Sequence, residues 1–134
     1  MQLLLNVCCE ETMIISIDYI KDAGSLEKER IVFAVNGDGQ LGKFLIAESQ
    51  TLDESKFSSL VKNPYWFPDR KIKAGDRVVL YTKKGVNNVV DNKNGTHTYF
   101  YYWGLENSHL VTDRACVVLF ETSWTVSVIS KDEE

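Results

Sequence analysis

Histidine, serine and acidic residues are the side chains of this sequence best suited to catalysis or metal binding. The two histidines, His97 and His109, are twelve residues apart and lack the short spacings typical of zinc ligands. Ser108, His109 and Asp113 can be drawn as a nucleophilic triad, but no nucleophile-elbow motif accompanies them. The sequence therefore predicts no catalytic residue, cofactor or metal. A hydrolase or metalloprotein that uses His97, His109, Asp91 or Asp113 is the last of three hypotheses.

Three glycines, Gly37, Gly39 and Gly42, have the G-x-G-x-x-G spacing of nucleotide-binding loops. That motif binds phosphate where a helix begins directly after it, because the helix N-terminus supplies free backbone N–H groups. Residues 43–47 have the pattern of a strand, so no helix is expected there. We therefore interpret the three glycines as turn residues.

Basic residues concentrate in residues 62–84, which contain seven lysines and arginines against two acids, in a chain of net charge −4. Tyr65, Trp66 and Phe67 lie within the same stretch. Lysine and arginine on phosphates with aromatic rings on bases are typical of single-strand nucleic-acid binding, whereas the same residues can simply protect a sheet edge. The residues predicted to contact a protein partner or nucleic acid are Trp66, Arg70, Lys71, Lys73, Arg77, Lys83 and Lys84.

The elements that must position these side chains are strands, because apolar residues recur mainly at a spacing of two. Strands are expected at residues 13–20, 29–35, 42–47, 77–83, 97–103, 114–121 and 123–130, and Asn94-Gly95 predicts a hairpin turn. Residues 48–63 are polar, with at most one short helix around residues 52–61. The expected fold is an all-β antiparallel sandwich of about seven or eight strands, with residues 1–134 forming one domain.

Two tryptophans outside the basic stretch, Trp103 and Trp124, are expected in the core or at its end, because their neighbours alternate between apolar and polar. Residues 99–103 place aromatic side chains on both faces of one strand. Such a strand has more apolar surface than one core covers, so an interaction patch or self-association is expected there.

Cysteine use indicates a reducing compartment. The chain has three cysteines, an odd number, and Cys8 and Cys9 are adjacent, which is poor geometry for a disulfide. Cys116, in the apolar run 115–120, is interpreted as a core residue. The first residues lack the basic region of a secretory signal, and no apolar run approaches the length of a membrane span. We therefore expect a cytoplasmic protein without a membrane segment.

The second half of the chain resembles the lamin-tail domain, including its stand-alone bacterial and phage versions. The resemblance rests on Gly75-Asp76 before a strand that ends at Tyr81-Thr82, on Tyr102-Trp103-Gly104, and on Asp113 before the strand 115–120. It covers mainly residues 72–120. It implies an immunoglobulin-like sandwich and a non-catalytic module that binds macromolecules such as proteins or DNA.

Two functions remain open beside the enzyme hypothesis. The first is an interaction module that binds another protein, with homo-oligomers possible. The second is a nucleic-acid-binding module that uses residues 62–84, since residues 66–81 are also similar to PUA and EVE barrels, which bind modified bases.

Overall fold

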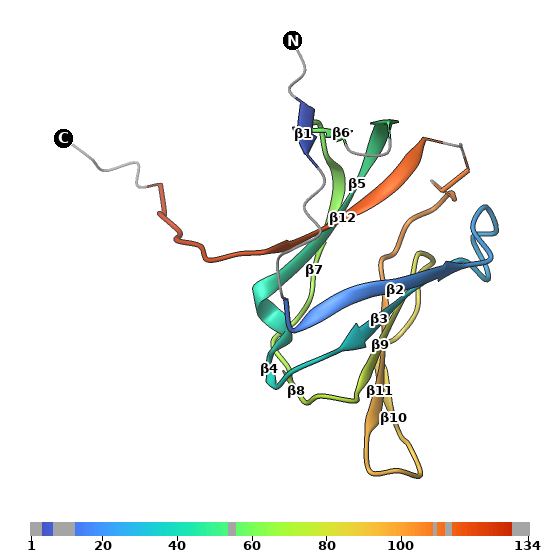
Figure 1. Cartoon of the computed structure of the whole chain (residues 1–134), viewed down its shortest axis with the longest axis vertical. Coiled ribbons are helices and arrows are strands. Elements are labelled where there is room, and N and C mark those ends of the chain that lie inside the picture. Colours follow the sequence, from blue (N-terminus) through green and yellow to red (C-terminus); the bar gives the residue numbers. More distant parts are fainter. Residues whose placement is uncertain (1–3, 7–12, 54–55, 109, 112–113, 130–134) are drawn as a thin grey trace.

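The computed structural model describes residues 4–6, 13–53, 56–108, 110–111 and 114–129, and these residues form a β-sandwich (Figure 1). Two five-stranded sheets and one two-stranded ribbon make up the described structure. The helical component of the described residues is one short 3-10 turn, η1 (Leu41–Lys43). The predicted all-β, immunoglobulin-like sandwich is therefore confirmed.

The first sheet is built around the long strand β5 (Phe44–Asp53). On one side of β5 lies β12 (Ala115–Glu121), and on the other side lie β7 (Lys62–Trp66) and β6 (Lys56–Ser58). The short strand β1 (Leu4–Asn6) pairs with β6. β12 is thus an edge strand, hydrogen-bonded to β5 alone among the strands of the described residues.

The second sheet has the order β10-β11-β9-β3-β2. Its strands are β2 (Ile15–Lys21), β3 (Arg30–Val35), β9 (Arg77–Tyr81), β10 (Asn88–Asp91) and β11 (His97–Tyr102). The β10–β11 hairpin forms at Asn94-Gly95 as predicted, and Gly95 has a φ of 85°, which glycine adopts at little cost. The hairpin reverses the chain, so β11 runs parallel to β9. An antiparallel arrangement was expected throughout, and this pair is the exception.

A separate ribbon consists of β4 (Gly39–Gln40) and β8 (Lys71–Ile72). The described residues contain more strands than the seven or eight expected. The additional ones are β7, five residues long, and β1, β4, β6 and β8, each two or three residues long. Segments of that length are too short to show a periodic pattern in the sequence.

The hydrophobic core lies between the two sheets and draws side chains from both. Phe44 and Ile46 of β5 face Ile31, Phe33, Val78 and Leu80 of β3 and β9, all fully buried. Trp103 packs against this core, as predicted. The core is thus continuous across the sandwich and holds each sheet in place through one of its faces.

The short helix considered around residues 52–61 does not form in the described part of this polar segment. Residues 48–53 complete β5, and β6 then returns alongside it. The polar residues of this segment satisfy one another, because the Ser49 hydroxyl donates to the carbonyl of Ser58 at 2.7 Å and the Leu60 N–H donates to the Ser58 hydroxyl at 3.0 Å. These hydrogen bonds explain how a polar sequence lies inside the sheet.

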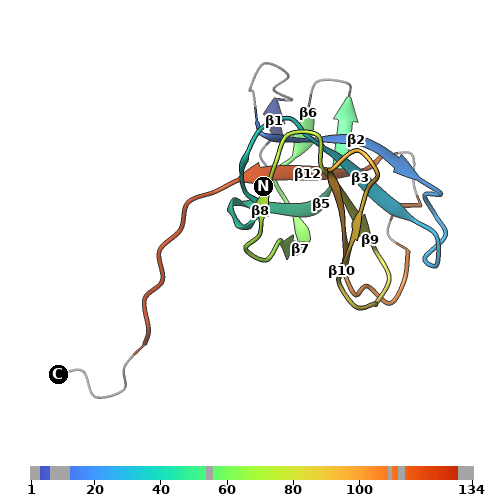
Figure 2. The same cartoon turned by 90° about the horizontal axis from the view of Figure 1, so that it is seen from below.

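The prediction of a strand at residues 123–130 is wrong for residues 123–129, the part that the structure describes. Residues 122–129 leave the end of β12 and extend away from both sheets without forming a strand (Figures 1 and 2). Trp124, expected in or near the core, is exposed. Cys8, Cys9, His109, Asp113 and the last five residues lie outside the described residues.

Candidate interaction surface

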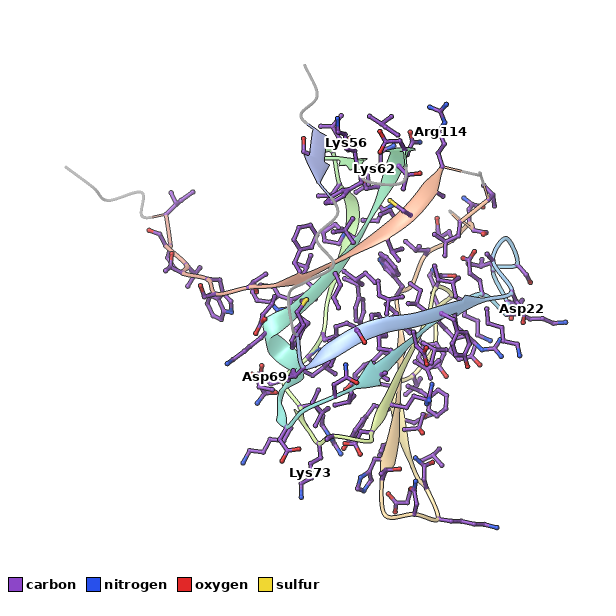
Figure 3. The ribbon with its side chains drawn as sticks, in the orientation of Figure 1. Asp22, Lys56, Lys62, Asp69, Lys73 and Arg114 are labelled. Carbon is purple, nitrogen blue, oxygen red and sulfur yellow. The ribbon has the colours of Figure 1, made fainter. Side chains whose placement is uncertain are left out.

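The basic residues of the stretch 62–84 are dispersed over the molecule. Figure 3 shows Lys62 near Lys56 and Arg114 at one end of the sandwich, whereas Lys73 lies at the opposite end. The chain crosses the whole domain between these two lysines through β7 and β8. Basic residues that are neighbours in sequence therefore do not form one positive face.

Three of the predicted contact residues are paired with acids from other parts of the chain. The guanidinium of Arg77 lies 3.2 Å from Asp18, and the amines of Lys83 and Lys84 lie 3.5 Å from Glu27 and 3.7 Å from Glu106. These exposed pairs contribute little to stability, yet they neutralise the local charge. The excess of positive charge in the sequence is thus partly balanced in space.

Arg70, Lys71 and Lys73 lie around the β4–β8 ribbon. The Arg70 guanidinium stacks 4.8 Å from the centre of the Tyr99 ring, a cation–π contact. Lys71 and Lys73 are exposed, and neither has an ion pair within the described part of the chain. This group of three is the largest cluster of predicted basic contact residues that share one region.

A salt titration of single-stranded DNA binding tests whether the basic stretch acts as one surface. The logarithm of the binding constant falls with the logarithm of salt concentration by about 0.7 per phosphate contact on single strands. Because three residues cluster, we expect a slope no steeper than about −2 by fluorescence anisotropy. A slope near about −5, the value for seven contacts, would show that the stretch does form one nucleic-acid surface.

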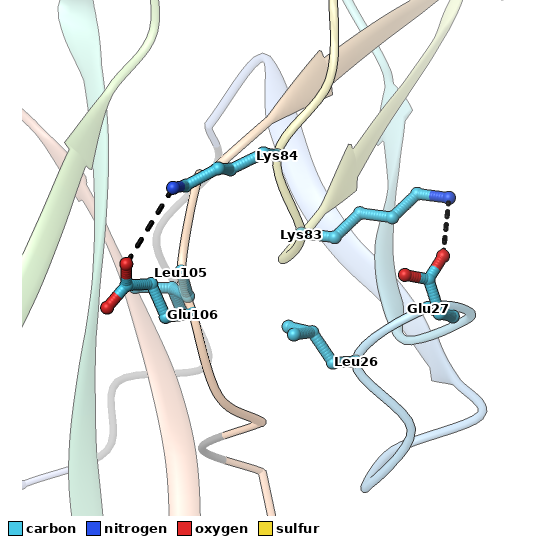
Figure 4. Close-up of a pocket in the computed structure, with 6 residues that line it drawn as sticks. All are labelled: Leu26, Glu27, Lys83, Lys84, Leu105 and Glu106. Atoms are coloured by element: carbon cyan, nitrogen blue, oxygen red, sulfur yellow. Dashed lines mark ion pairs between the residues drawn. The ribbon is translucent and has the colours of Figure 1, made fainter.

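A shallow pocket of about 380 Å³ lies beside Lys83 and Lys84 (Figure 4). It is lined by Leu26, Glu27, Lys83, Lys84, Leu105 and Glu106. The two lysine–glutamate pairs described above stand on either side of the leucines. Because each charge already has an opposite partner, the pocket presents no net charge to a ligand.

Trp66 is the predicted contact residue that lies on an apolar surface. It pairs with Leu45 of β5, and Leu45 pairs on its other side with Phe120 of β12. Directly opposed residues point to the same face of a sheet. The next residue of β5, Ile46, points into the core, so Trp66, Leu45 and Phe120 form a row on the outer face of the sheet.

Trp124 extends this row from beyond the end of β12. Its ring packs edge-on against Trp66, with centroids 5.6 Å apart and planes at 88°. The Trp66 indole N–H also donates to the carbonyl of Gly42 at 2.7 Å, which fixes the ring at the surface. We call Trp66, Leu45, Phe120 and Trp124 the outer row. Trp66 is among the predicted contact residues, whereas Trp124 was expected in the core or at its end, because its alternating neighbours are those of a paired strand.

His97 lies between two carboxylates at the start of β11. Its Nε2 is 3.2 Å from Asp91, and its Nδ1 is 3.9 Å from Asp76. Asp76 is buried and accepts the backbone N–H groups of Lys73 and His97, so it holds the turn before β9 against β11. No set of three or more His, Cys, Asp or Glu side chains within the described ranges is arranged to hold a metal ion.

Two tyrosines, Tyr101 in the core and the partly buried Tyr65, have a raised pKa. Burial raises the pKa of Tyr101 from 10.0 to about 12, with Arg70 lowering it and Tyr65 and Tyr99 raising it further. Burial also raises the pKa of Tyr65. Burial in an apolar core disfavours the charged phenolate, so both groups are held neutral.

The raised pKa of Tyr101 predicts a loss of stability in alkali. Below pH 10 the phenol is neutral in both states, so its contribution is fully present. As the pH rises from about 10 to about 12, the unfolded chain releases this proton first and stability falls. Urea unfolding midpoints across this range are expected to fall less for Tyr101→Phe than for the unsubstituted protein. Equal decreases would contradict the assignment.

The comparisons with known proteins identify no relative. No protein-family model, no curated protein and no solved structure matches this chain. Among the described residues, no helix is both long and apolar enough to span a membrane.

Proposed function

We propose that this chain is a non-catalytic interaction domain that binds another protein through its outer row. The observation that carries the proposal is the contact between two solvent-facing tryptophans, Trp66 and Trp124, on the outer face of the first sheet. The proposal extends to a cytoplasmic, lamin-tail-like module, which the resemblance over residues 72–120 supports.

Tryptophan at a surface is well suited to protein recognition. Its ring offers a large contact area while losing few rotamers, and alanine scans find tryptophan enriched among the residues that dominate binding energy. Leu45 and Phe120 connect the two tryptophans across β5 and β12, so the apolar surface is continuous. Three of the predicted basic contact residues are instead engaged in exposed ion pairs.

Nucleic-acid binding remains the alternative prediction, in its lamin-tail-like or PUA- and EVE-like form. Its support is the composition of residues 62–84 together with the cluster of Arg70, Lys71 and Lys73. Absence of single-stranded DNA binding at low salt, where counterion release favours binding most, would rule out this alternative.

Site-specific photo-crosslinking tests the proposed function. A photoreactive phenylalanine analogue replaces Trp66, and a control carries it at Tyr19 of β2, which is 48% exposed against 45% for Trp66. We expect protein adducts of discrete mass from position 66 that unlabelled protein competes away. Equal adducts from both positions, or adducts destroyed by nuclease, would contradict the proposal.

A further inference from the structure

Residues 122–129, here called the C-terminal arm, have the sequence pattern of a strand but pair with no strand of the described residues. Trp124, Val126 and Val128 alternate with Thr125 and Ser127, as on a strand with one buried face. Val126 is 75% exposed, Val128 86% and Ile129 92%. Valine and isoleucine in this number are unusual on a free surface and favour extended, paired backbone.

Within the described part of the chain, β12 pairs with β5 alone, which leaves its other edge open next to the arm. Its residues 115–120 are all apolar, a run typical of strands buried on both faces, yet each is only half-buried. Val117 and Leu119 face the core, whereas Cys116, Val118 and Phe120 lie on the outer face. An open edge with such side chains is a template for another strand.

The hydrogen bonds of Thr122 define which backbone groups are free on that edge. The Thr122 N–H donates to the carbonyl of Lys43 at 2.8 Å, which continues the β5–β12 ladder by one residue. In an antiparallel strand, every second residue directs both its N–H and its C=O group to the same neighbouring strand. The N–H and C=O groups of the even-numbered residues of β12 are therefore directed to β5. Those of the odd-numbered residues 115, 117, 119 and 121 are directed to the open side.

We infer that a second copy of this chain occupies the open edge of β12, with the arm of each copy pairing antiparallel to β12 of the other. This inference rests on the proposed function and names its partner. A two-fold axis at Thr122 places Phe120 opposite Trp124, Val118 opposite Val126, and Cys116 opposite Val128. All six positions are even-numbered, so the apolar side chains of both strands lie on one face.

The same register satisfies the free backbone groups and avoids charge conflict. Residues 115, 117, 119 and 121 of β12 meet residues 129, 127, 125 and 123 of the second copy in hydrogen-bonded pairs. Glu121 is opposite Ser123, and Thr122 is opposite its own symmetry mate, a favourable cross-strand pair. A two-fold axis at Glu121 would oppose two carboxylates, and one at Ser123 would place Trp124 opposite Thr122.

Engineered disulfides test this register directly. Non-hydrogen-bonded antiparallel pairs have Cα atoms about 4.5 Å apart, within the range that a disulfide spans. In a Cys8→Ser, Cys9→Ser background, Val128→Cys is expected to form a reducible dimer through Cys116 on mild oxidation. In the matched control Val126→Cys, the new cysteine lies opposite Val118 in the register, so the two chains are expected to remain largely without a disulfide crosslink.

A second pair of substitutions tests the same strand register independently of Cys116. With all native cysteines replaced by serine, Val118→Cys combined with Val126→Cys is expected to crosslink two chains, and Val118→Cys combined with Val128→Cys is not. Crosslinking within one chain would show that the arm folds back on its own β12 and would overturn the inference. Absence of dimers from both matched pairs would overturn it as well.

The mass of the protein in solution tests for the dimer without engineered cysteines. Sedimentation of the unsubstituted protein over a concentration series is expected to approach twice the 15.3 kDa chain mass. Val126→Asp is expected to weaken the dimer at least about tenfold, because it places a carboxylate against Val118. Val86→Asp, at an equally exposed valine distant from the arm in sequence, is expected to leave it unchanged. A monomer at every concentration would contradict self-pairing.

The two proposals fail in different ways. A monomer whose position 66 still yields competed protein adducts would refute the second copy as partner and retain protein binding through the outer row. A protein with neither dimer nor adducts would refute both.

Discussion

Phe67→Ala is expected to lower the free energy of unfolding by about 3–5 kcal/mol, the range for removing a buried phenylalanine ring. Phe67 follows β7 and points into the core, where its ring contacts three others edge-on. The centroid distances are 5.5 Å to Phe33, 5.3 Å to Tyr65 and 5.5 Å to Tyr101. Alanine leaves a cavity between the sheets and removes these aromatic contacts together. Urea or thermal unfolding measures the loss.

The adjacent Trp66→Ala is the matched control for this substitution. Trp66 points to the outer face and is partly exposed, and its indole makes one hydrogen bond, to the carbonyl of Gly42. We expect a loss of about 1 kcal/mol, clearly smaller than for Phe67→Ala. Equal losses from the two variants would contradict the assignment of Phe67 to the core and Trp66 to the surface.

Glu29→Ala is also expected to lower the free energy of unfolding by about 3–5 kcal/mol, for a different reason. Glu29 is 0% exposed and precedes β3. Its carboxylate accepts the Thr82 hydroxyl at 2.7 Å, the Ser108 hydroxyl at 2.7 Å and the Gly24 N–H at 2.8 Å. It therefore joins the β2–β3 turn, the end of β9 and the loop before β12. Alanine leaves three donors without their acceptor, at about 1–3 kcal/mol for each one that water does not reach.

Two further substitutions separate the hydrogen bonds from the charge. Glu29→Gln keeps the size but turns an N–H₂ group toward the donors, so an intermediate loss of about 1–3 kcal/mol is expected. Glu27→Ala removes an exposed acid two residues away, paired with Lys83, and is expected to change stability by less than about 0.5 kcal/mol. A Glu29→Ala variant as stable as Glu27→Ala would show that the carboxylate does not hold these three segments.

Local pattern was sufficient to predict most strands of this domain. β2, β3, β9, β11 and β12 lie where apolar residues alternate or run together, and the turn at Asn94-Gly95 forms where predicted. The reason is that successive side chains of a strand point to opposite faces. A strand with one buried face therefore has an apolar residue at every second position. Glycine marks turns equally locally, because it alone tolerates positive φ without cost, as at Gly75 with a φ of 95°.

The candidate surface was much less predictable. The stretch 62–84 is basic in sequence, but Asp18, Glu27 and Glu106 approach Arg77, Lys83 and Lys84 from distant segments. Charge depends on distance in space, and a chain that crosses the whole sandwich between Lys62 and Lys73 separates charges that are neighbours in sequence (Figure 3). Of the predicted contact residues, Trp66 lies in the outer row, which only the cross-strand register assembles.

The C-terminal arm shows most clearly what the sequence determines and what the tertiary structure decides. Its alternating residues Trp124, Val126 and Val128 determine by themselves that the segment is suited to an extended strand with one apolar face. Whether such a segment is paired depends on where the neighbouring strands end. The ladder between β5 and β12 ends where the Thr122 N–H donates to the carbonyl of Lys43, the residue before β5. The sequence by itself thus determined the longer strands and the hairpin turn at Asn94-Gly95. The tertiary structure decided which edges and apolar faces remain open, because hydrogen-bond partners and burial come from segments far apart in the chain.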